Sequence, residues 1–362
     1  MVYGIDASAL LKANPTGVEN YARLLLGEMM KLSLLPGESV VLYARDEKPL
    51  SLELPVGWAW KAVPFRFSKG WTHFALAREL TVNPVNVFFS PAHEVPLAFG
   101  TAKVVTTVHD VVFAKNPKLY SWFQNFRQRA AVKHAVGVAS RILAVSGATK
   151  RDVIALFKAD EAKITVTHLA PTVEPGVQVS PADLGQYFLY VGRVEEKKNV
   201  GTLVEAFRRY KESMPAGDTT KLILAGGLGY GGEKILDLAK GFGDAKPVHL
   251  GYVPAEQISS LYAGALVFVF PSHDEGFGLP ILDAMKLGVP TLVSDIPVFH
   301  EIAGSASEYA LPSDPTAFAL KMKLLAESTE LRTSLALRGQ AQAEKYSWTE
   351  TARLTWEALR SV

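Results

Sequence analysis

The 362-residue sequence contains no cysteine, which excludes disulfide bonds and thiolate metal sites and fits a reducing compartment. No apolar run approaches the roughly eighteen residues that a membrane-spanning helix needs. The N-terminal residues also lack the basic segment and apolar stretch of a signal peptide. We therefore expect a cytoplasmic protein, and we leave open peripheral contact with the inner face of the membrane.

A strong excess of charge of either sign is missing as well. Lys and Arg total 38, Asp and Glu total 36, and the formal net charge is +2. Because nucleic-acid-binding proteins usually carry a strongly basic face, we expect no nucleic-acid partner. The hydrophobic share of 48% and charged share of 20% are typical of a globular protein, and the length suffices for two domains.

The most informative stretch is residues 266–291, LVFVFPSHDEGFGLPILDAMKLGVPT. Its apolar start predicts a strand buried on both faces, and residues 279–287 are expected to form a helix. The loop between them contains Gly276 and Gly278 on either side of Phe277. A helix N-terminus at the carboxyl end of a parallel strand is suited to anion binding, so we expect a ligand site here.

Two acids flank this loop, Glu275 and Asp283, which are 283 − 275 = 8 positions apart. Together they could bind two hydroxyl-bearing parts of one ligand. The alternative is that Asp283, expected in the first helical turn, only complements the helix dipole and that Glu275 is a solvated loop acid.

Short apolar segments alternate with amphipathic ones along the chain, which predicts βα units and parallel sheets. Strands are expected at 3–7, 39–43, 87–89, 104–108, 142–145 and 165–168, and again at 187–191, 222–225, 248–250, 266–270 and 291–294. Residues 171–185 contain Pro and Gly and are interpreted as a linker between two domains. A capping box at Ser347 predicts a final helix.

Polar residues follow several of these strands. His109 and Asp110 come after the strand at 104–108, and a histidine there can donate or accept a proton near neutral pH. Arg193 and Lys198 follow the strand at 187–191, and two cations at a strand-to-helix turn suit a diphosphate. The alternatives are a histidine satisfied by the backbone and a solvated charged loop.

Three motifs carry a resemblance to a known family. Glu275-Gly-Phe-Gly-Leu-Pro with a second acid eight positions later resembles the Glu-x7-Glu signature of retaining GT-B glycosyltransferases, above all glycosyltransferase family 4, also called group 1. Gly192-Arg193 followed after four residues by Lys198-Asn199 resembles that family's diphosphate-binding motif, and TTVHDVVF at 106–113 resembles its first-domain motif. The second acid departs from the pattern, because Asp283 is one methylene shorter than glutamate.

The resemblance implies an α/β, GT-B fold of two Rossmann-like domains facing each other across a cleft. Residues 1–174 would form the acceptor-binding domain and 175–346 the donor-binding domain, with the helix at 347–362 packing back on the first. The segments GIDAS and TGVENYAR look most like the mannosyltransferase branch that builds O-antigens and other surface polysaccharides.

The activity implied is retaining transfer of a hexose from a nucleotide-diphosphate sugar to a glycan or lipid-linked acceptor. GDP-mannose is the first candidate donor, and UDP-glucose or another UDP-sugar is the second. We expect neither a metal nor another cofactor, because protein cations and a helix dipole would neutralise the diphosphate, and the chain also contains no Asp-x-Asp motif. A two-lobed, non-catalytic sugar-binding protein is the rival function.

The resemblance also assigns roles to residues. His109 and Glu275 would hold the transferred sugar, and Arg193 and Lys198 would stabilise the leaving diphosphate. Asp283 would contact the nucleotide ribose. The other donor-binding candidates are Gly17, Gly192, Tyr252, Val253, Gly276, Phe277, Gly278 and Leu279.

Three further segments allow two interpretations each. Residues 65–71 and the helix expected at 120–139 mix aromatic and basic side chains, which suits a membrane surface, but we favour packing of the aromatics into the domain. The glycine-rich loop at 226–232 lacks the G-x-G-x-x-G spacing of a dinucleotide site. We interpret it as a loop that lets backbone segments approach closely, which disfavours an NAD-dependent dehydrogenase.

Overall fold

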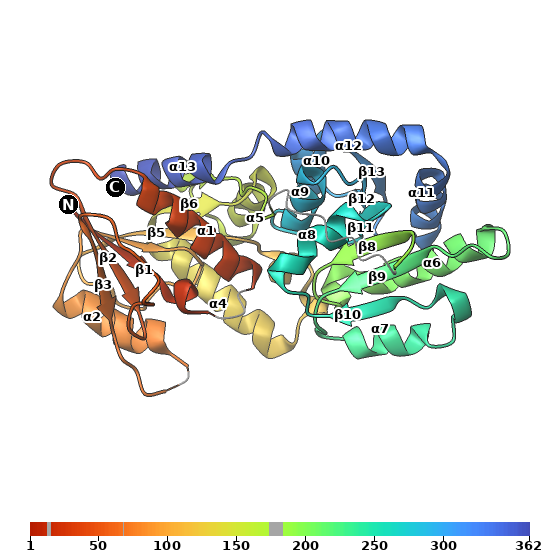
Figure 1. Ribbon diagram of the computed structural model, residues 1–362. Coiled ribbons are helices and arrows are strands. Elements are labelled where there is room, and N and C mark those ends of the chain that lie inside the picture. The colour runs from red at the N-terminus through yellow and green to blue at the C-terminus, as the bar shows by residue number, and fades with distance from the viewer. Residues whose placement is uncertain (13–15, 68, 174–183) are drawn as a thin grey trace. The chain divides into compact units, whose positions relative to one another are not determined.

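A computed structural model describes residues 1–12, 16–67, 69–173 and 184–362. The chain divides into two compact units (Figure 1), Met1–Leu169 with Ser347–Val362, and Ala170–Tyr346. The expected boundary at 174/175 falls in a segment outside the described residues, and the first unit ends at Leu169 instead. Part of the expected linker, residues 174–183, is likewise outside the described residues.

The first unit contains a seven-stranded parallel sheet in the order β3-β2-β1-β4-β5-β6-β7. Its strands are β1 (Val2–Asp6), β2 (Ser39–Ala44), β3 (Trp58–Ala62), β4 (Val87–Ser90), β5 (Lys103–Val108), β6 (Ala139–Ala144) and β7 (Ile164–Val166). Its helices are α1 (Gly17–Lys31), α2 (Ala77–Val82), α3 (Val112–Lys115), α4 (Trp122–Val138), α5 (Gly147–Phe157) and α13 (Trp348–Arg360), and the π-helical turn η2 (Thr72–Leu76) precedes α2. The strand at β3 was not predicted.

The last helix, α13, belongs to the first unit although it follows the second in sequence. Ser347 caps it by accepting a hydrogen bond from the Glu350 backbone N–H. The buried Trp356 ring stands edge-on to the rings of Tyr3 and Trp58, at centroid distances of 5.3 and 6.1 Å. Figure 1 shows α13 alongside α1. Burial of these large aromatic rings stabilises the contact.

The second unit contains a six-stranded parallel sheet in the order β10-β9-β8-β11-β12-β13. Its strands are β8 (Tyr187–Val191), β9 (Lys221–Ala225), β10 (Val248–Gly251), β11 (Val267–Phe270), β12 (Thr291–Ser294) and β13 (Ser307–Ala310). Its helices are α6 (Val200–Ser213), α7 (Gly232–Ala239), α8 (Ala255–Ala263), α9 (Leu279–Lys286), α10 (Pro297–Ala303), α11 (Pro315–Glu327) and α12 (Thr329–Ala343). All four residues of β11 are buried, as the apolar run predicted.

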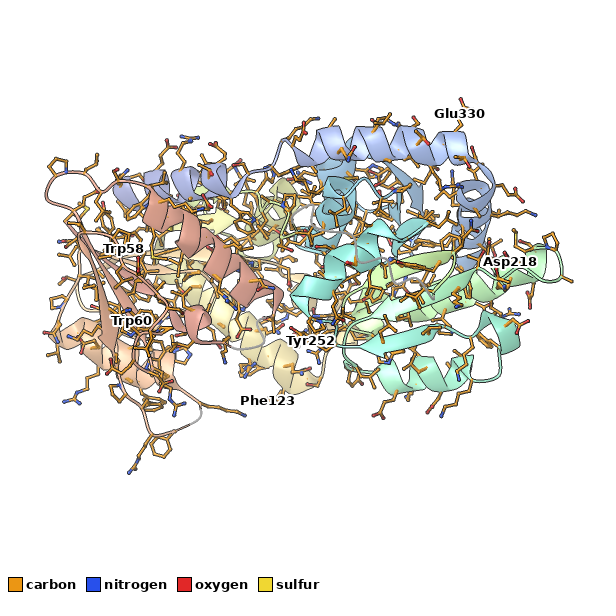
Figure 2. All side chains as sticks on the ribbon, viewed as in Figure 1. Trp58, Trp60, Phe123, Asp218, Tyr252 and Glu330 are labelled. Atoms are coloured by element: carbon orange, nitrogen blue, oxygen red, sulfur yellow. The ribbon has the colours of Figure 1, made fainter. Side chains whose placement is uncertain are left out.

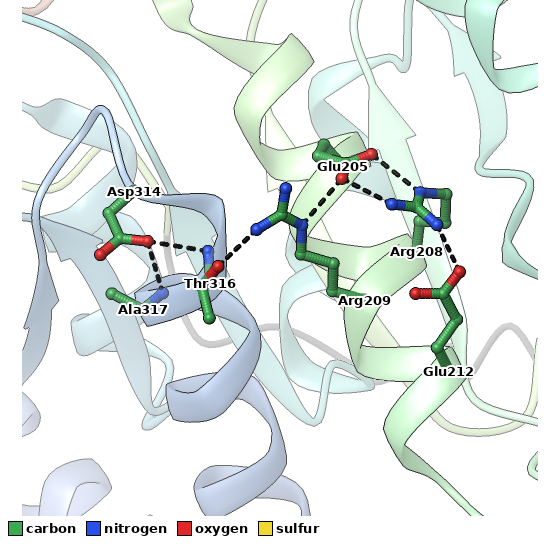
Figure 3. A network of polar contacts seen from close by, with 7 residues as sticks. All are labelled: Glu205, Arg208, Arg209, Glu212, Asp314, Thr316 and Ala317. Atoms are coloured by element: carbon green, nitrogen blue, oxygen red, sulfur yellow. Dashed lines mark hydrogen bonds and ion pairs between the residues drawn. The ribbon is translucent and has the colours of Figure 1, made fainter.

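A polar network joins α6 to α11 on the surface of the second unit (Figure 3). The Glu205 carboxylate accepts hydrogen bonds from Arg208 at 2.7 Å and Arg209 at 2.8 Å, and Arg209 also donates to the Thr316 hydroxyl. Asp314 caps α11 by accepting from the Thr316 backbone N–H at 2.9 Å. These contacts fix the helix that begins directly after Lys198 and Asn199.

The order of strands reverses once in each sheet, between β1 and β4 and between β8 and β11. In open α/β sheets, ligands bind beyond the carboxyl ends of the strands where the order reverses. The fold therefore predicts a ligand site near Asp6 and residues 90–94 in the first unit. It predicts another near Arg193 and residues 271–275 in the second unit.

Candidate functional site

In the second unit, a cation and an acid meet where the strand order reverses. The Lys198 Nζ lies 2.5 Å from the Glu275 Oε1, and the Ser272 hydroxyl donates to the same oxygen at 2.7 Å. The Lys198 and Glu275 side chains are only 22% and 14% exposed. Lys198 also lies 5.6 Å from the centre of the Phe270 ring. Two residues separated by 77 positions in the sequence are thus in direct contact.

Asn199 holds this turn in place. It adopts a left-handed conformation with φ 55°, which Asn tolerates better than most residues. Its buried side-chain amide donates to the carbonyl oxygens of Pro271 at 2.9 Å and Pro312 at 2.6 Å. Asn199 therefore ties the loop that carries Lys198 to the end of β11. The motif includes Asn199, but its positioning role was not predicted.

The glycine-rich loop packs directly on the loop after β8. A Cβ on Gly226 would lie 2.1 Å from the Gly192 carbonyl oxygen, and one on Gly232 would lie 2.2 Å from that of Val194. The prediction of a close-approach loop is confirmed. Arg193 is exposed and its guanidinium donates to the Leu228 carbonyl at 3.2 Å, so it lies at the surface beside the glycine-rich loop.

The helix N-terminus predicted after Glu275 is present. Gly278 is the N-cap of α9 with φ 113°, a conformation that favours glycine, and Leu279 begins the helix. Gly276 and Phe277 are buried between Glu275 and this cap, with the Phe277 ring edge-on to that of Tyr346 at 6.0 Å. The first backbone N–H groups of α9 therefore follow Glu275 by only a few residues, and such groups attract anions.

Asp283 lies deeper in α9 than expected. It is beyond the first turn and only 7% exposed. Its carboxylate accepts hydrogen bonds from the Thr172 backbone N–H at 2.6 Å and the Thr172 hydroxyl at 2.9 Å. Burial raises the Asp283 pKa to about 6, against the lowering effect of these hydrogen bonds. The interpretation of Asp283 as a first-turn acid is wrong, because the helix begins at Leu279 and turns this side chain into the unit.

The remaining donor-binding candidates of the second unit follow the carboxyl ends of its strands. Gly192 directly follows β8 with φ 148°. Tyr252 and Val253 follow β10, where Tyr252 is exposed (Figure 2) and Val253 is half-buried. A side chain in the position of Tyr252 is available to stack on a flat ligand group.

In the first unit, His109 directly follows β5 and is buried. Its Nε2 lies 2.9 Å from the Pro91 carbonyl oxygen, and its ring stands edge-on to that of Tyr21 at 4.7 Å. Burial lowers the His109 pKa to about 4, against the hydrogen bond to Pro91. At neutral pH the ring is therefore uncharged, and it can take part in hydrogen bonds without repelling a cation.

Gly17 is the first residue of α1, behind a capping box formed by Thr16 and Glu19. A Cβ added to Gly17 would meet no described atom within 4 Å. Gly17 and His109 belong to the first unit, and the other candidate residues belong to the second.

Three residues at the β1/β4 reversal were not predicted. Asp6 ends β1 and accepts from the Ser8 backbone N–H at 2.9 Å, and burial raises the pKa of Asp6. His93 and Glu94 follow β4. Burial lowers the His93 pKa, opposed by Asp110 and Glu94, and its Nδ1 has no hydrogen-bond partner among the described residues. No local pattern in the sequence marks these residues, because their proximity follows from the order of the strands in the sheet.

Comparisons with known proteins now identify the family. The family model for Glycosyltransferase Family 4 matches residues 15–170, and the model for Glycosyl transferases group 1 matches residues 179–342. O-antigen chain mannosyltransferase B of Escherichia coli is 30% identical over 269 residues, which cover 71% of this chain and 70% of that protein. The chain belongs to the group 1 glycosyltransferases.

Other relatives of this glycosyltransferase match over part of their length. O-antigen chain mannosyltransferase RfbU of Salmonella typhimurium is 29% identical over 62% of this chain and 65% of its own. The serotype-specific mannosyltransferase WbdA of Escherichia coli is 27% identical over 74% of this chain, but the match spans only 34% of WbdA.

Solved structures show the same fold. WaaG, a glycosyltransferase involved in lipopolysaccharide biosynthesis, superposes with a TM-score of 0.73 at 15% identity, covering 99% of each chain. HepE of Anabaena in complex with UDP and glucose gives a TM-score of 0.75 at 16% identity, covering 100% of this chain and 99% of that one. The predicted α/β, GT-B class is confirmed.

Proposed function

We propose that this glycosyltransferase moves mannose from GDP-mannose to a glycan or lipid-linked acceptor in polysaccharide synthesis, with retention at the anomeric carbon. The observation that carries the proposal is the contact between Lys198 and Glu275 at the β8/β11 reversal. The choice of mannose is supported by the relatives, which include O-antigen mannosyltransferases.

The proposed chemistry follows from the charged groups at the β8/β11 reversal. Lys198, Arg193 and the N-terminus of α9 are suited to neutralise the diphosphate as it leaves, because preorganised donors stabilise developing charge. Glu275 would bind the sugar hydroxyls and release Lys198 toward the phosphates when the donor enters. Such a scheme supplies positive charge from the protein, so no metal or other cofactor is included in the proposal.

The two units would divide the substrates. The second would bind the nucleotide-sugar, and Asp283 would reach the ribose by exchanging its hydrogen bonds with Thr172 for the ribose hydroxyls. Tyr252 and Val253 would lie at the base. The diphosphate and sugar positions would be lined by Gly192, Gly276, Phe277, Gly278 and Leu279. The first would bind the acceptor at the β1/β4 reversal, where Asp6, His93 and Glu94 can form hydrogen bonds with hydroxyl groups. His109 would contact the transferred sugar as a neutral ring, and Gly17 would leave room for the donor phosphates.

A UDP-sugar is the second candidate donor. HepE, which shares the fold, was solved with UDP and glucose, and its likeness to this chain covers nearly the whole of both. Selectivity between GDP and UDP would depend on the base contacts near Tyr252, because the phosphate contacts are the same for both nucleotides.

A turnover assay tests the proposal. The enzyme is incubated with GDP-mannose or UDP-glucose and a mannose-terminated oligosaccharide, and release of nucleoside diphosphate and the anomeric configuration of the product are measured. Glu275→Gln should lower the rate by roughly a hundred-fold or more, because it removes a charge at the reacting sugar. Glu233→Gln, at an exposed position on α7, is the matched control.

The outcomes separate the candidates. Release of GDP with an α-linked product supports the proposal, and an inverted product contradicts retention. Release of UDP alone selects the second donor. If neither nucleotide is released while free sugars bind, the non-catalytic sugar-binding alternative replaces the proposal.

A further inference from the structure

The first turns of α4 carry an exposed aromatic surface. Trp122, Phe123 and Phe126 are 81%, 65% and 61% exposed, and we call these three residues the α4 patch. The Trp122 and Phe126 rings stack at a centroid distance of 5.8 Å. The prediction that the aromatics of this helix pack into the domain is therefore wrong for its first turns. The residues that α4 buries are the smaller Val132 and Ala135.

The patch is held on an ordered helix. Ser121 and Gln124 form a capping box at the helix start. The Arg129 guanidinium donates to the Ala114 carbonyl at 2.9 Å and to the Asn125 side chain at 2.9 Å, which fastens α4 to the end of α3. Exposed large rings on a fixed helix are unusual unless they meet an apolar partner.

The positive charge around the α4 patch indicates an anionic partner. Between Asp110 and Asp152 the sequence has eight Lys or Arg residues and no Asp or Glu. On α4 itself, Arg127 and Lys133 form no ion pair with any residue that the structure describes. Lys133 follows Trp122 by eleven positions, so it projects from the same helix face. Aromatic rings beside unpaired cations suit the interface of an anionic lipid bilayer.

The patch also lies close to the acceptor end of the first sheet. The Asn125 side chain, one residue before Phe126, donates a hydrogen bond to the carbonyl oxygen of Phe113, which follows His109 by four residues, so the first turns of α4 lie near the end of β5. Phe123 is at the lower end of α4 in Figure 2, and the segment between β3 and α2 reaches the same side of the first unit in Figure 1. That segment carries the exposed Phe67, with the Arg66 guanidinium 4.5 Å from the centre of its ring.

We propose that the α4 patch docks the first unit on an anionic bilayer and so presents a lipid-linked acceptor to the carboxyl edge of the first sheet. The presentation of the acceptor rests on the proposed function, whereas the docking does not. No helix in the described parts of the chain is long and apolar enough to cross a membrane, so the contact proposed is with the bilayer surface.

Sedimentation with vesicles tests the docking. Phosphatidylcholine vesicles with and without phosphatidylglycerol are compared for the wild type and for a variant with Trp122→Ser, Phe123→Ser and Phe126→Ser. The wild type should bind the anionic vesicles preferentially, and the variant should bind them at least about ten-fold more weakly, since it loses three apolar anchors. Lys133→Gln should weaken binding roughly five-fold, because one cation near the surface is removed.

A matched control removes exposed apolar side chains elsewhere. Leu320→Ser with Leu324→Ser changes two exposed leucines on α11 of the second unit and should leave vesicle binding unchanged. Thermal unfolding midpoints show that each variant is folded. Binding of the triple variant equal to that of the wild type, equal loss in the control, or failure of the wild type to bind anionic vesicles overturns the proposal.

A turnover arm separates this proposal from the proposed function. The triple variant should keep its rate on a water-soluble acceptor and lose rate on an acceptor embedded in anionic vesicles. Equal loss on both acceptors overturns the docking role. If the wild type turns over neither acceptor, the proposed function fails, and the sedimentation result still decides whether the patch binds lipid.

Discussion

Asp283→Asn should stabilise the second unit at neutral pH and have little effect at acid pH. Burial raises the Asp283 pKa from 3.8 to about 6, so the folded state binds this proton more tightly than the unfolded state does. The stability that the protonated group contributes is complete below about pH 4 and is lost as the pH rises through about 6. Above that pH, the buried charge opposes folding.

The magnitude follows from the size of the shift. Two pKa units correspond to about 3 kcal/mol at 1.36 kcal/mol per unit, which is an upper value for the gain. Asparagine keeps an acceptor for the Thr172 backbone N–H and can donate to the Thr172 hydroxyl, but these bonds lose their charge. We therefore expect a net gain of about 1 to 3 kcal/mol at neutral pH, or roughly 2 to 10 °C in the unfolding temperature of a unit of this size.

Calorimetric unfolding between about pH 4 and pH 8 measures this effect, with the transitions of the two units analysed separately. The wild type should lose stability relative to Asp283→Asn as the pH rises through about 6. Asp237→Asn, at an exposed position paired with Lys240, is the control and should show no such divergence. Parallel curves for wild type and Asp283→Asn across this range would refute the reasoning, because the buried carboxylate would then carry no raised pKa.

Two further predictions concern other contacts. Gly226→Ala should destabilise the second unit by more than about 2 kcal/mol because the new Cβ meets the Gly192 carbonyl, whereas Gly227→Ala, where no atom lies within 4 Å, should be close to neutral in urea unfolding. Equal effects of the two substitutions would contradict the close approach. The hydrogen bonds from Arg360 lower the pKa of Glu38 to about 2, so this pair stabilises the first unit above about pH 4.5 and the effect is lost as the pH falls through about 2. In unfolding experiments at decreasing pH, Arg360→Ala should reduce the loss of unfolding free energy of the first unit by about 1 kcal/mol. The same loss in wild type and variant would show that the pair contributes nothing.

The strands in the interior of each sheet were all predicted, whereas two of the four edge strands were missed. Strands β8 and β12 were predicted with their observed ends, because a strand covered on both faces needs a short apolar run with polar or glycine boundaries. Strands β3 and β13 were missed, and each lies at one edge of its sheet, whereas β7 and β10 at the opposite edges were predicted. An edge strand is partly exposed, so its sequence is mixed and carries no such run.

The site was predictable in part. Motif spacing placed Lys198 and Glu275 at the ends of two strands, but their direct contact depends on β8 and β11 being neighbours, which spacing does not reveal. The hydrogen bonds between Asp283 and Thr172 join positions 111 residues apart, so no local pattern indicates them. Asp6 and His93 were missed because their importance follows from the strand order alone.

The α4 patch was misjudged for a related reason. Aromatic residues four positions apart mark one helix face, but periodicity does not say which face meets the sheet. In α4 the face toward the domain is made by Val132 and Ala135, whose small side chains allow close packing. The stacked rings of Trp122 and Phe126 therefore remain on the outside.

Binding of GDP and UDP by isothermal titration calorimetry, without added metal, is the most direct test of the donor site at the β8/β11 reversal. Wild type and Lys240→Ala, a surface control in the same unit, should bind GDP equally well. Lys198→Ala should bind it roughly 10- to 100-fold more weakly, because a charged hydrogen bond is worth about 1.5 to 3 kcal/mol. Unchanged affinity in Lys198→Ala, or no binding of either nucleotide by the wild type, would contradict the assignment of the donor site.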